Sequence, residues 1–142
     1  MNQQREIKFS SPETLPPPMG YSHVVGVRGG RTIYISGQTA RDKSGAMVGV
    51  GDFRAQLTQV FVNLDLAIRS CGGSFADVVK LNYYCCDSVP LTDLPHVIAV
   101  RDRFVNNKAP PASTFVVVRR LVMPEWLIEI DAVVVVADDG RS

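Results

Sequence analysis

The feature that most restricts the fold is a strand-like run near the C-terminus, residues 127–136. Strand side chains alternate between two faces, so one face of this run is wholly apolar, whereas the other carries Glu129 and Asp131. The apolar face belongs against a core. Two interpretations of the acidic face stay open: solvated charges on a sheet, or a general acid/base carboxylate in a cleft between subunits.

Composition indicates an ordinary globular protein. The chain has 142 residues, of which 46% are hydrophobic and 20% are charged, and we expect a single domain over residues 1–142 whose first 19 residues are partly loop. A net charge of +1 creates no long-range field to steer nucleic acid or an anionic membrane. The N-terminus lacks an apolar signal segment, and no run approaches the roughly 20 apolar residues that span a bilayer, so we expect a cytoplasmic protein without membrane contact.

The histidines and cysteines do not indicate a metal site. His23 and His96 are the only histidines and lie far apart in the sequence, without H-x-H or H-E-x-x-H spacing. The cysteines are Cys71, Cys85 and Cys86, an odd number without C-x-x-C spacing, and we expect free, partly buried thiols. Cys85 and Cys86 would point to opposite faces of a strand, and their role stays open.

The N-terminal third of the chain is predicted to be β-structure with loops. A short strand over residues 6–9 precedes a proline run at 16–18, which cannot continue a ladder. Residues 23–28 and 32–36 are strand-like and flank Gly29-Gly30, which predicts a hairpin.

From Asp52 onward the apolar spacing predicts two helices among strands. The first helix begins at Asp52 as N-cap and ends at Gly72-Gly73. Its apolar stripe is Leu57, Val60, Phe61, Leu64 and Ile68. A strand over 78–86 follows. The second helix, from about Thr92, carries the stripe Leu94, Val97, Ile98, Arg101 and Phe104. Strands over 114–121 and 126–136, separated by Met123-Pro124-Glu125, complete the chain.

The predicted order β-β-β-α-β-α-β-β indicates an α+β fold, one sheet with two helices on a single face. The other face then has no cover. Because the strands are rich in Val, Ile, Phe and Tyr on both faces, we expect the chain to oligomerise through the uncovered face.

Six short motifs in order, from about residue 20 to 136, resemble the RidA/YjgF family of reactive intermediate deaminases. The motifs lie at residues 20–23, 35–38, 56–73, 77–80, 111–114 and 127–132. The resemblance implies a chorismate-mutase-like fold and a homotrimer whose sheets meet centrally, with a ligand cleft at each subunit junction. It also implies hydrolysis of enamines or imines, the products of pyridoxal-phosphate enzymes, to 2-keto acids and ammonia without a metal or organic cofactor.

Three of the family's site positions match this chain and two depart from it. The resemblance places a substrate-binding tyrosine at Tyr21, a glycine at Gly37 and the catalytic carboxylate at Glu129. The arginine that binds the substrate carboxylate is replaced by Ser113, and a nearby cysteine by Phe115. The chain therefore resembles a branch of the family that lacks this arginine.

The loss of the arginine restricts the expected substrate. An arginine holds a carboxylate by two charge-assisted bonds, whereas a serine hydroxyl offers one neutral donor. Arg119 lies about 20 Å along the strand from Ser113, too far to replace the arginine, and whether Arg41 compensates stays open. We expect weak or absent activity on the usual 2-imino acids and a preference for a less anionic substrate in a more apolar cleft.

Each site residue also has a structural interpretation. Tyr21 could simply pack at an interface. Gly37 could be an ordinary strand end that uses the backbone freedom of glycine, and Ser113 could be a hydrogen-bonding or filler residue. Two functions remain: a cofactor-free hydrolase or deaminase, or a non-catalytic trimer that binds a small metabolite or a protein. Endoribonuclease activity, sometimes attached to the family, ranks last because the chain lacks a basic stripe with exposed aromatics and a histidine pair.

Overall fold

The acidic strand near the C-terminus, β6 (Ile128–Val136), is an inner strand of a four-stranded sheet in the computed structural model of this protein, which describes residues 4–139. The first three and last three residues of the domain expected over residues 1–142 lie outside the described residues. The element order β-β-β-α-β-α-β-β confirms the prediction. The other elements are β1 (Glu6–Ser10), β2 (Val24–Arg28), β3 (Arg31–Gln38), α1 (Phe53–Ser70), β4 (Val78–Cys86), α2 (Pro95–Arg101), β5 (Ala112–Val118) and the 3-10 turns Phe75–Asp77 and Leu91–Asp93.

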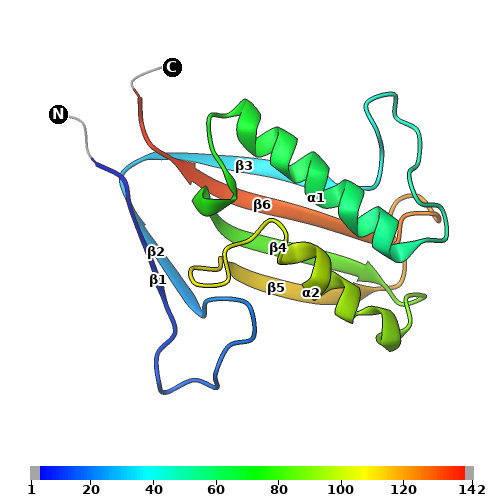
Figure 1. Ribbon diagram of the computed structural model, residues 1–142, viewed down its shortest axis with the longest axis horizontal. Coiled ribbons are helices and arrows are strands. Elements are labelled where there is room, and N and C mark those ends of the chain that lie inside the picture. Colours follow the sequence, from blue (N-terminus) through cyan, green and yellow to red (C-terminus); the bar gives the residue numbers. More distant parts are fainter. Residues whose placement is uncertain (1–3, 140–142) are drawn as a thin grey trace.

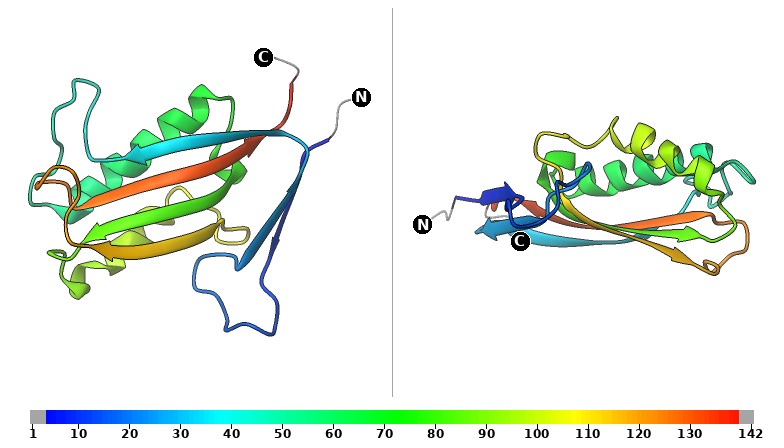
Figure 2. Two further views of the ribbon diagram at one scale, coloured as in Figure 1. Left: turned by 180° about the vertical axis from the view of Figure 1, so that it is seen from behind. Right: turned by 90° about the horizontal axis from the view of Figure 1, so that it is seen from below.

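The main sheet has the strand order β3-β6-β4-β5. Strand β6 is antiparallel to β3 and β4, and β5 runs parallel to β4 at one edge. Both helices lie on the same face of this sheet (Figure 1). Seen from behind, the other face carries no helix (Figure 2). The predicted α+β architecture with two helices on one face is therefore confirmed, and we call the two sides of the sheet the covered face and the uncovered face.

The prediction of a single sheet with a hairpin between β2 and β3 is wrong. Strand β2 pairs with β1 in a separate two-stranded ribbon, which projects from the end of the main sheet (Figure 2). Gly29 and Gly30 do turn the chain with φ of 65° and 78°, but β3 pairs with β6. The physical reason is long-range burial, because Ile35 of β3 is only 8% exposed beneath α1 while most of β2 stays exposed. A favourable turn permits local pairing but does not outweigh a core.

Helix α1 forms where its apolar spacing predicts. Asp52 is the N-cap, and its Oδ1 accepts a hydrogen bond of 3.0 Å from the Ala55 N–H. The residues of the predicted stripe are all fully buried: Leu57, Val60, Phe61, Leu64 and Ile68. Gly72 adopts a left-handed φ of 82° just after the helix, and the N–H of Gly73 bonds to the Ile68 carbonyl at 3.1 Å. Burial of one stripe thus fixes α1 on the covered face.

Aromatic rings join α1 to the segments around α2. The Phe61 ring stacks on Phe104 with centroids 5.3 Å apart and lies 6.0 Å from Phe75 and 6.4 Å from Tyr83. Helix α2 itself is shorter than predicted, because Pro95 begins it and the stretch before it forms a 3-10 turn. Ile98 of the predicted stripe is 48% exposed, so the buried stripe of α2 is narrower than the sequence suggested.

Gln56 is a fully buried polar residue on α1. Its Nε2 donates to the carbonyls of Gly49 at 3.0 Å and Glu125 at 2.9 Å, and its Oε1 accepts from the Leu127 N–H at 2.9 Å. The side chain therefore joins the loop before α1 to the segment that enters β6. It satisfies three backbone groups that the core would otherwise leave without partners.

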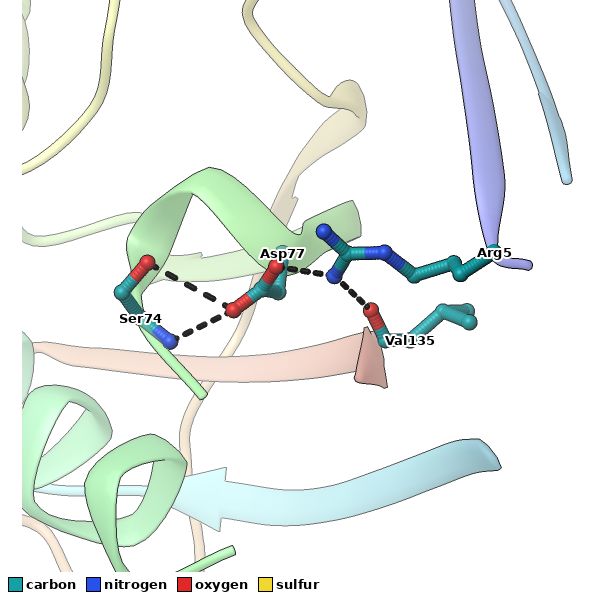
Figure 3. A network of polar contacts seen from close by, with 4 residues as sticks. All are labelled: Arg5, Ser74, Asp77 and Val135. Atoms are coloured by element: carbon teal, nitrogen blue, oxygen red, sulfur yellow. Dashed lines mark hydrogen bonds and ion pairs between the residues drawn. The ribbon is translucent and has the colours of Figure 1, made fainter. Parts of the chain in front are cut away.

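A second polar network fixes the N-terminal segment (Figure 3). Arg5 Nη1 donates to Asp77 Oδ1 and, at 2.8 Å, to the Val135 carbonyl. The other carboxylate oxygen of Asp77 accepts from the Ser74 N–H at 2.8 Å. Because these residues come from three distant parts of the chain, the network joins β1 to the ends of β4 and β6.

The three cysteines are free thiols, as predicted. Cys85 and Cys86 are fully buried rather than partly buried, and Cys71 is half-buried. Burial raises the pKa of the Cys85 thiol to about 11. Within residues 4–139, no helix is both long and apolar enough to cross a membrane.

Candidate functional site

An acidic cluster lies on the uncovered face of the sheet, formed by Glu129 and Asp131 of β6 with Asn82 and Tyr84 of β4. The ladder places Asn82 opposite Asp131 and Tyr84 opposite Glu129. Asp131 accepts hydrogen bonds from Asn82 Nδ2 at 2.8 Å and from the Tyr84 hydroxyl at 3.1 Å. The Asp131 carboxylate is thus stabilised by its strand neighbours, and the hydrogen bond to Asp131, together with its negative charge, raises the pKa of the Tyr84 hydroxyl.

Glu129 differs from Asp131, because it accepts no hydrogen bond from the neighbouring strand. The side chain is half-buried, and its carboxyl group has no hydrogen-bond partner among residues 4–139. Burial raises the pKa of the Glu129 carboxyl, and the negative charge of Asp131 raises it further. A carboxyl group that keeps its proton to higher pH and has free oxygens is suited to general acid/base chemistry.

Gly37 lies directly against Glu129. A Cβ atom at position 37 would stand 2.8 Å from Glu129 Cδ and 2.9 Å from Cγ, closer than Cβ atoms approach other atoms in real structures. The backbone of Gly37 does not lie in the left-handed region, so the close approach of the Glu129 side chain, rather than backbone freedom, favours glycine here. Two of the predicted site residues, Gly37 and Glu129, are therefore in contact.

A cavity of about 560 Å³, lined mostly by polar residues, adjoins Gly37 between the loop after β3 and helix α1. Arg41, Lys43 and Asn63 are among the residues that line it. The Arg41 guanidinium lies 5.9 Å from the centroid of the Trp126 ring. Arg41, which the sequence offered as a substitute for the missing arginine, therefore lines the same cavity as Gly37.

The remaining predicted residues line a second space, which we call the Ser113 cavity. It measures about 240 Å³ and lies between β5, α2 and the loop before β2. Its lining consists of Met19, Tyr21, Tyr83, Leu94, Val97, Ile98, Arg101, Ser113 and Phe115. Phe115 stacks on Tyr83 with ring centroids 5.5 Å apart, and Tyr21 meets His23 edge-on at 5.2 Å. Ser113, Phe115 and Tyr21 thus share one mostly apolar cavity.

Arg101 is a cavity residue that the sequence reasoning missed. It comes from the last turn of α2, and its side chain is only 14% exposed. Its Nε and Nη2 donate to Asp102 Oδ1 at 3.0 and 2.9 Å. The sequence signal that could have identified Arg101 was its position as a cation within the predicted apolar stripe of the second helix. The two substitutes that the sequence offered, Arg119 and Arg41, come from the Ser113 strand and from a loop, whereas Arg101 reaches the cavity from a helix. Arg119, just beyond the end of β5, is exposed and pairs with Asp87 at 3.5 Å.

Within one chain the predicted site residues form two separate groups. Tyr83 lines the Ser113 cavity, whereas the next residue, Tyr84, belongs to the acidic cluster. Because successive strand residues point to opposite faces, the two groups lie on opposite sides of the sheet. The structure brings Glu129 to Gly37, and Tyr21 to Ser113 and Phe115, but does not join these groups in a single chain. Among residues 4–139, no three His, Cys, Asp or Glu side chains cluster as metal ligands would.

Comparison with known sequences and structures shows which proteins this chain resembles. Residues 12–136 match the family model described as Endoribonuclease L-PSP. A 2-iminobutanoate/2-iminopropanoate deaminase from Dermatophagoides farinae is 30% identical over 85% of this chain and 90% of its own length. A RutC family protein from Pyrococcus horikoshii is 32% identical over 91% of this chain and 96% of its own length. A crystal structure of a Rid family protein from Yersinia pestis aligns with a TM-score of 0.83 and 37% identity, over 92% of this chain and 98% of that chain.

Proposed function

This chain belongs to the RidA/YjgF family, whose model is described as Endoribonuclease L-PSP, and we propose from that membership that it is a cofactor-free hydrolase of a small enamine, imine or related reactive metabolite. The observation that carries the proposal is the Glu129 carboxyl, which has a raised pKa, free oxygens and a glycine beside it. The name of the mite relative, an iminobutanoate and iminopropanoate deaminase, supports the reaction class.

The proposed site requires more than one copy of the chain. Glu129 and Gly37 lie on the uncovered face, whereas Tyr21, Ser113 and Phe115 line a cavity on the covered side, so a neighbouring subunit must bring the two groups together. We propose a homotrimer with its sheets inward and both helices outward. The ligand cleft then lies at each subunit junction. Light scattering that gave the monomer mass of 15.5 kDa at micromolar concentration would contradict this arrangement.

In the proposed reaction, water adds to the carbon of a C=N bond and the nitrogen gains a proton. Glu129 removes a proton from the attacking water and returns one to the nitrogen. The hydroxyl proton of the resulting carbinolamine then passes to the nitrogen as the C–N bond breaks, which releases ammonia and leaves a C=O group. No electron acceptor is needed, because hydrolysis changes no oxidation state. Because burial raises the pKa of the Glu129 carboxyl, the same residue is suited to accept and to return a proton.

Ser113 limits the proposed substrate range. A hydroxyl offers one neutral hydrogen bond in place of an arginine fork, so we expect weaker hydrolysis of the usual 2-imino acids than an arginine-bearing relative achieves. The substitution Ser113→Arg, with Phe115→Cys to provide room, should create or raise this activity. The measurement is keto-acid production from 2-aminoacrylate generated in situ by a dehydratase. Wild-type rates equal to those of an arginine-bearing relative would show that Ser113 does not limit the substrate.

The experiment that tests the function is ammonia release from a panel of imines. Glu129→Gln keeps the shape of the side chain but removes its acid/base group, and should lower the rate by roughly 10²–10⁴-fold. Glu13→Gln, at an exposed loop position, is the matched control and should leave the rate unchanged. Equal rates for wild type and Glu129→Gln would contradict the proposed role of Glu129.

The alternative is a non-catalytic trimer that binds a small metabolite or a protein in the same cleft. The replacements at Ser113 and Phe115 favour it, because they remove the group that fixes a substrate carboxylate in the family pattern. Ligand binding without ammonia release from any imine would support this alternative. A cytoplasmic location, a single domain over residues 1–142 and the absence of any cofactor remain predictions of the sequence.

A further inference from the structure

The Ser113 cavity contains a positive group that position 113 itself does not supply. Among the described residues that line this cavity, Arg101 alone carries a charge at neutral pH. Most of the others are apolar or aromatic, with the Ser113 hydroxyl and two tyrosine hydroxyls as polar exceptions. A largely apolar cavity with one guanidinium is a pattern that binds and orients a small ligand with a polar end.

The Arg101 guanidinium is held in place on two sides. Asp102 Oδ1 accepts from both Nε and Nη2, which fixes the plane of the group. The backbone of Gly20 lies against the guanidinium, since a Cβ there would stand 2.3 Å from Nη2 and 2.6 Å from Nη1. Within residues 4–139, Nη1 has no hydrogen-bond partner. One end of a well-positioned guanidinium is thus left to bind a ligand.

The chemistry of the lining defines the ligand class. A guanidinium N–H donates most strongly to a carboxylate oxygen. Tyr83 and Phe115 form a stacked aromatic wall, and Val97 adds an aliphatic one. A volume of about 240 Å³ exceeds the roughly 30 Å³ of a water molecule several-fold, so a branched or aromatic group of several atoms fits.

We propose that Arg101 is the anion-binding residue of the Ser113 cavity and that the cavity takes a small monocarboxylate with a branched or aromatic body. Asp102 limits the affinity, because it competes with the ligand for the same guanidinium. Arg101 then supplies from α2 the cation that Ser113 does not, which replaces the expectation, drawn from Ser113 alone, of a less anionic substrate. This inference rests on the proposed function in one respect: if the protein hydrolyses imines, its substrates keep a carboxylate and carry a larger apolar group than the 2-imino derivative of alanine.

Binding of benzoate and benzamide to the full chain tests the inference, because the two probes share a shape and differ in charge. By titration calorimetry, wild type should bind benzoate more tightly than benzamide. Arg101→Gln should weaken benzoate binding about tenfold or more, the effect of losing a charged hydrogen bond, and leave benzamide binding nearly unchanged. Arg103→Gln removes an equal charge from an exposed neighbour outside the cavity and should change benzoate binding less than twofold.

Asp102→Asn provides a test in the opposite direction. It frees the guanidinium and removes a nearby negative charge, so benzoate binding should tighten several-fold. Equal affinity of wild type for both probes, unchanged benzoate binding in Arg101→Gln, or no gain in Asp102→Asn would each overturn the inference. Circular dichroism checks that Arg101→Gln folds, and if it does not, the Asp102→Asn result decides.

The outcome is independent of catalysis, since benzoate contains no C=N bond. Ammonia release from imines without Arg101-dependent benzoate binding would overturn the inference and leave the proposed function intact. Benzoate binding through Arg101 without ammonia release from any imine would support the inference and count against the hydrolase.

Discussion

The two faces of the main sheet differ in what their side chains contact. On the covered face of β6, Ile128, Ile130 and Val134 are fully buried beneath the protein's own helices. On the uncovered face of the same strand, Glu129 and Asp131 bear carboxylates, and the neighbouring Tyr34 of β3 is 80% exposed. Because side chains alternate along a strand, adjacent residues can serve separate purposes. Substitutions on the covered face should therefore alter folding, and those on the uncovered face should alter assembly and activity.

The largest expected effect lies on the covered face. Phe61→Ala removes a fully buried ring that contacts three other aromatic rings, and should lower the free energy of unfolding by about 3–5 kcal/mol. Urea denaturation measures this loss. Tyr34→Ala on the uncovered face should show a loss that depends on protein concentration, because it acts through subunit association. Identical, concentration-independent losses in both variants would remove the distinction between the faces.

The next effect tests the polar residue at the centre of α1. Gln56→Leu provides no replacement partner for the backbone groups of Gly49, Glu125 and Leu127 that Gln56 bonds, and should cost about 2–3 kcal/mol. The matched control is Gln59→Leu, because Gln59 is only half-buried and its Nε2 makes a single hydrogen bond to Asn63. Chemical denaturation of both variants gives the comparison. Equal stability losses would mean that the buried network of Gln56 has no special weight.

A pair of glycines tests the uncovered face. Gly37→Ala would place a methyl group against the Glu129 carboxyl and should displace this flexible side chain, with imine hydrolysis falling about tenfold and stability changing by less than ~1 kcal/mol. Gly26→Ala is the control, because a Cβ there meets no atom within 4 Å. Steady-state assays and thermal unfolding on both variants separate the two effects. If Gly37→Ala kept full activity, the contact between Gly37 and Glu129 would have no catalytic importance.

The smallest expected effect is the pH dependence of stability. The folded-state pKa of Glu129 is raised, so the folded protein holds this proton above the pH at which the unfolded chain loses it. The stabilisation that the protonated Glu129 carboxyl contributes is fully present below its pKa in the unfolded chain, about 4.3. It is lost as the pH rises through its pKa in the folded protein. Glu129→Gln should therefore become slightly more stable relative to wild type as pH rises through this window. Thermal unfolding at several pH values measures the difference, and a parallel pH dependence in both proteins would contradict it.

Much of the fold was predictable because the responsible signals are local. The apolar stripe from Leu57 to Ile68 and the Asp52 cap specify α1, and alternation specifies β6. The Gly29-Gly30 turn failed as a hairpin signal, since β3 contributes more burial beside β6 than beside β2. Sequence also identified Glu129, Gly37, Tyr21, Ser113 and Phe115 as candidates, but their grouping depends on which face of the sheet each side chain reaches.

The sequence by itself determined the order of helices and strands, the family, and the two carboxylates on one face of β6. These follow from periodicity, caps and short motifs, which act within a few residues of one another. Tertiary structure decided which groups meet. It placed Glu129 against Gly37 across a strand pair, separated both from the Ser113 cavity, and brought Arg101 from a helix to a cavity whose own strand carries serine. Such contacts join residues far apart in the chain, and no local pattern specifies them, since they follow from burial of the whole core.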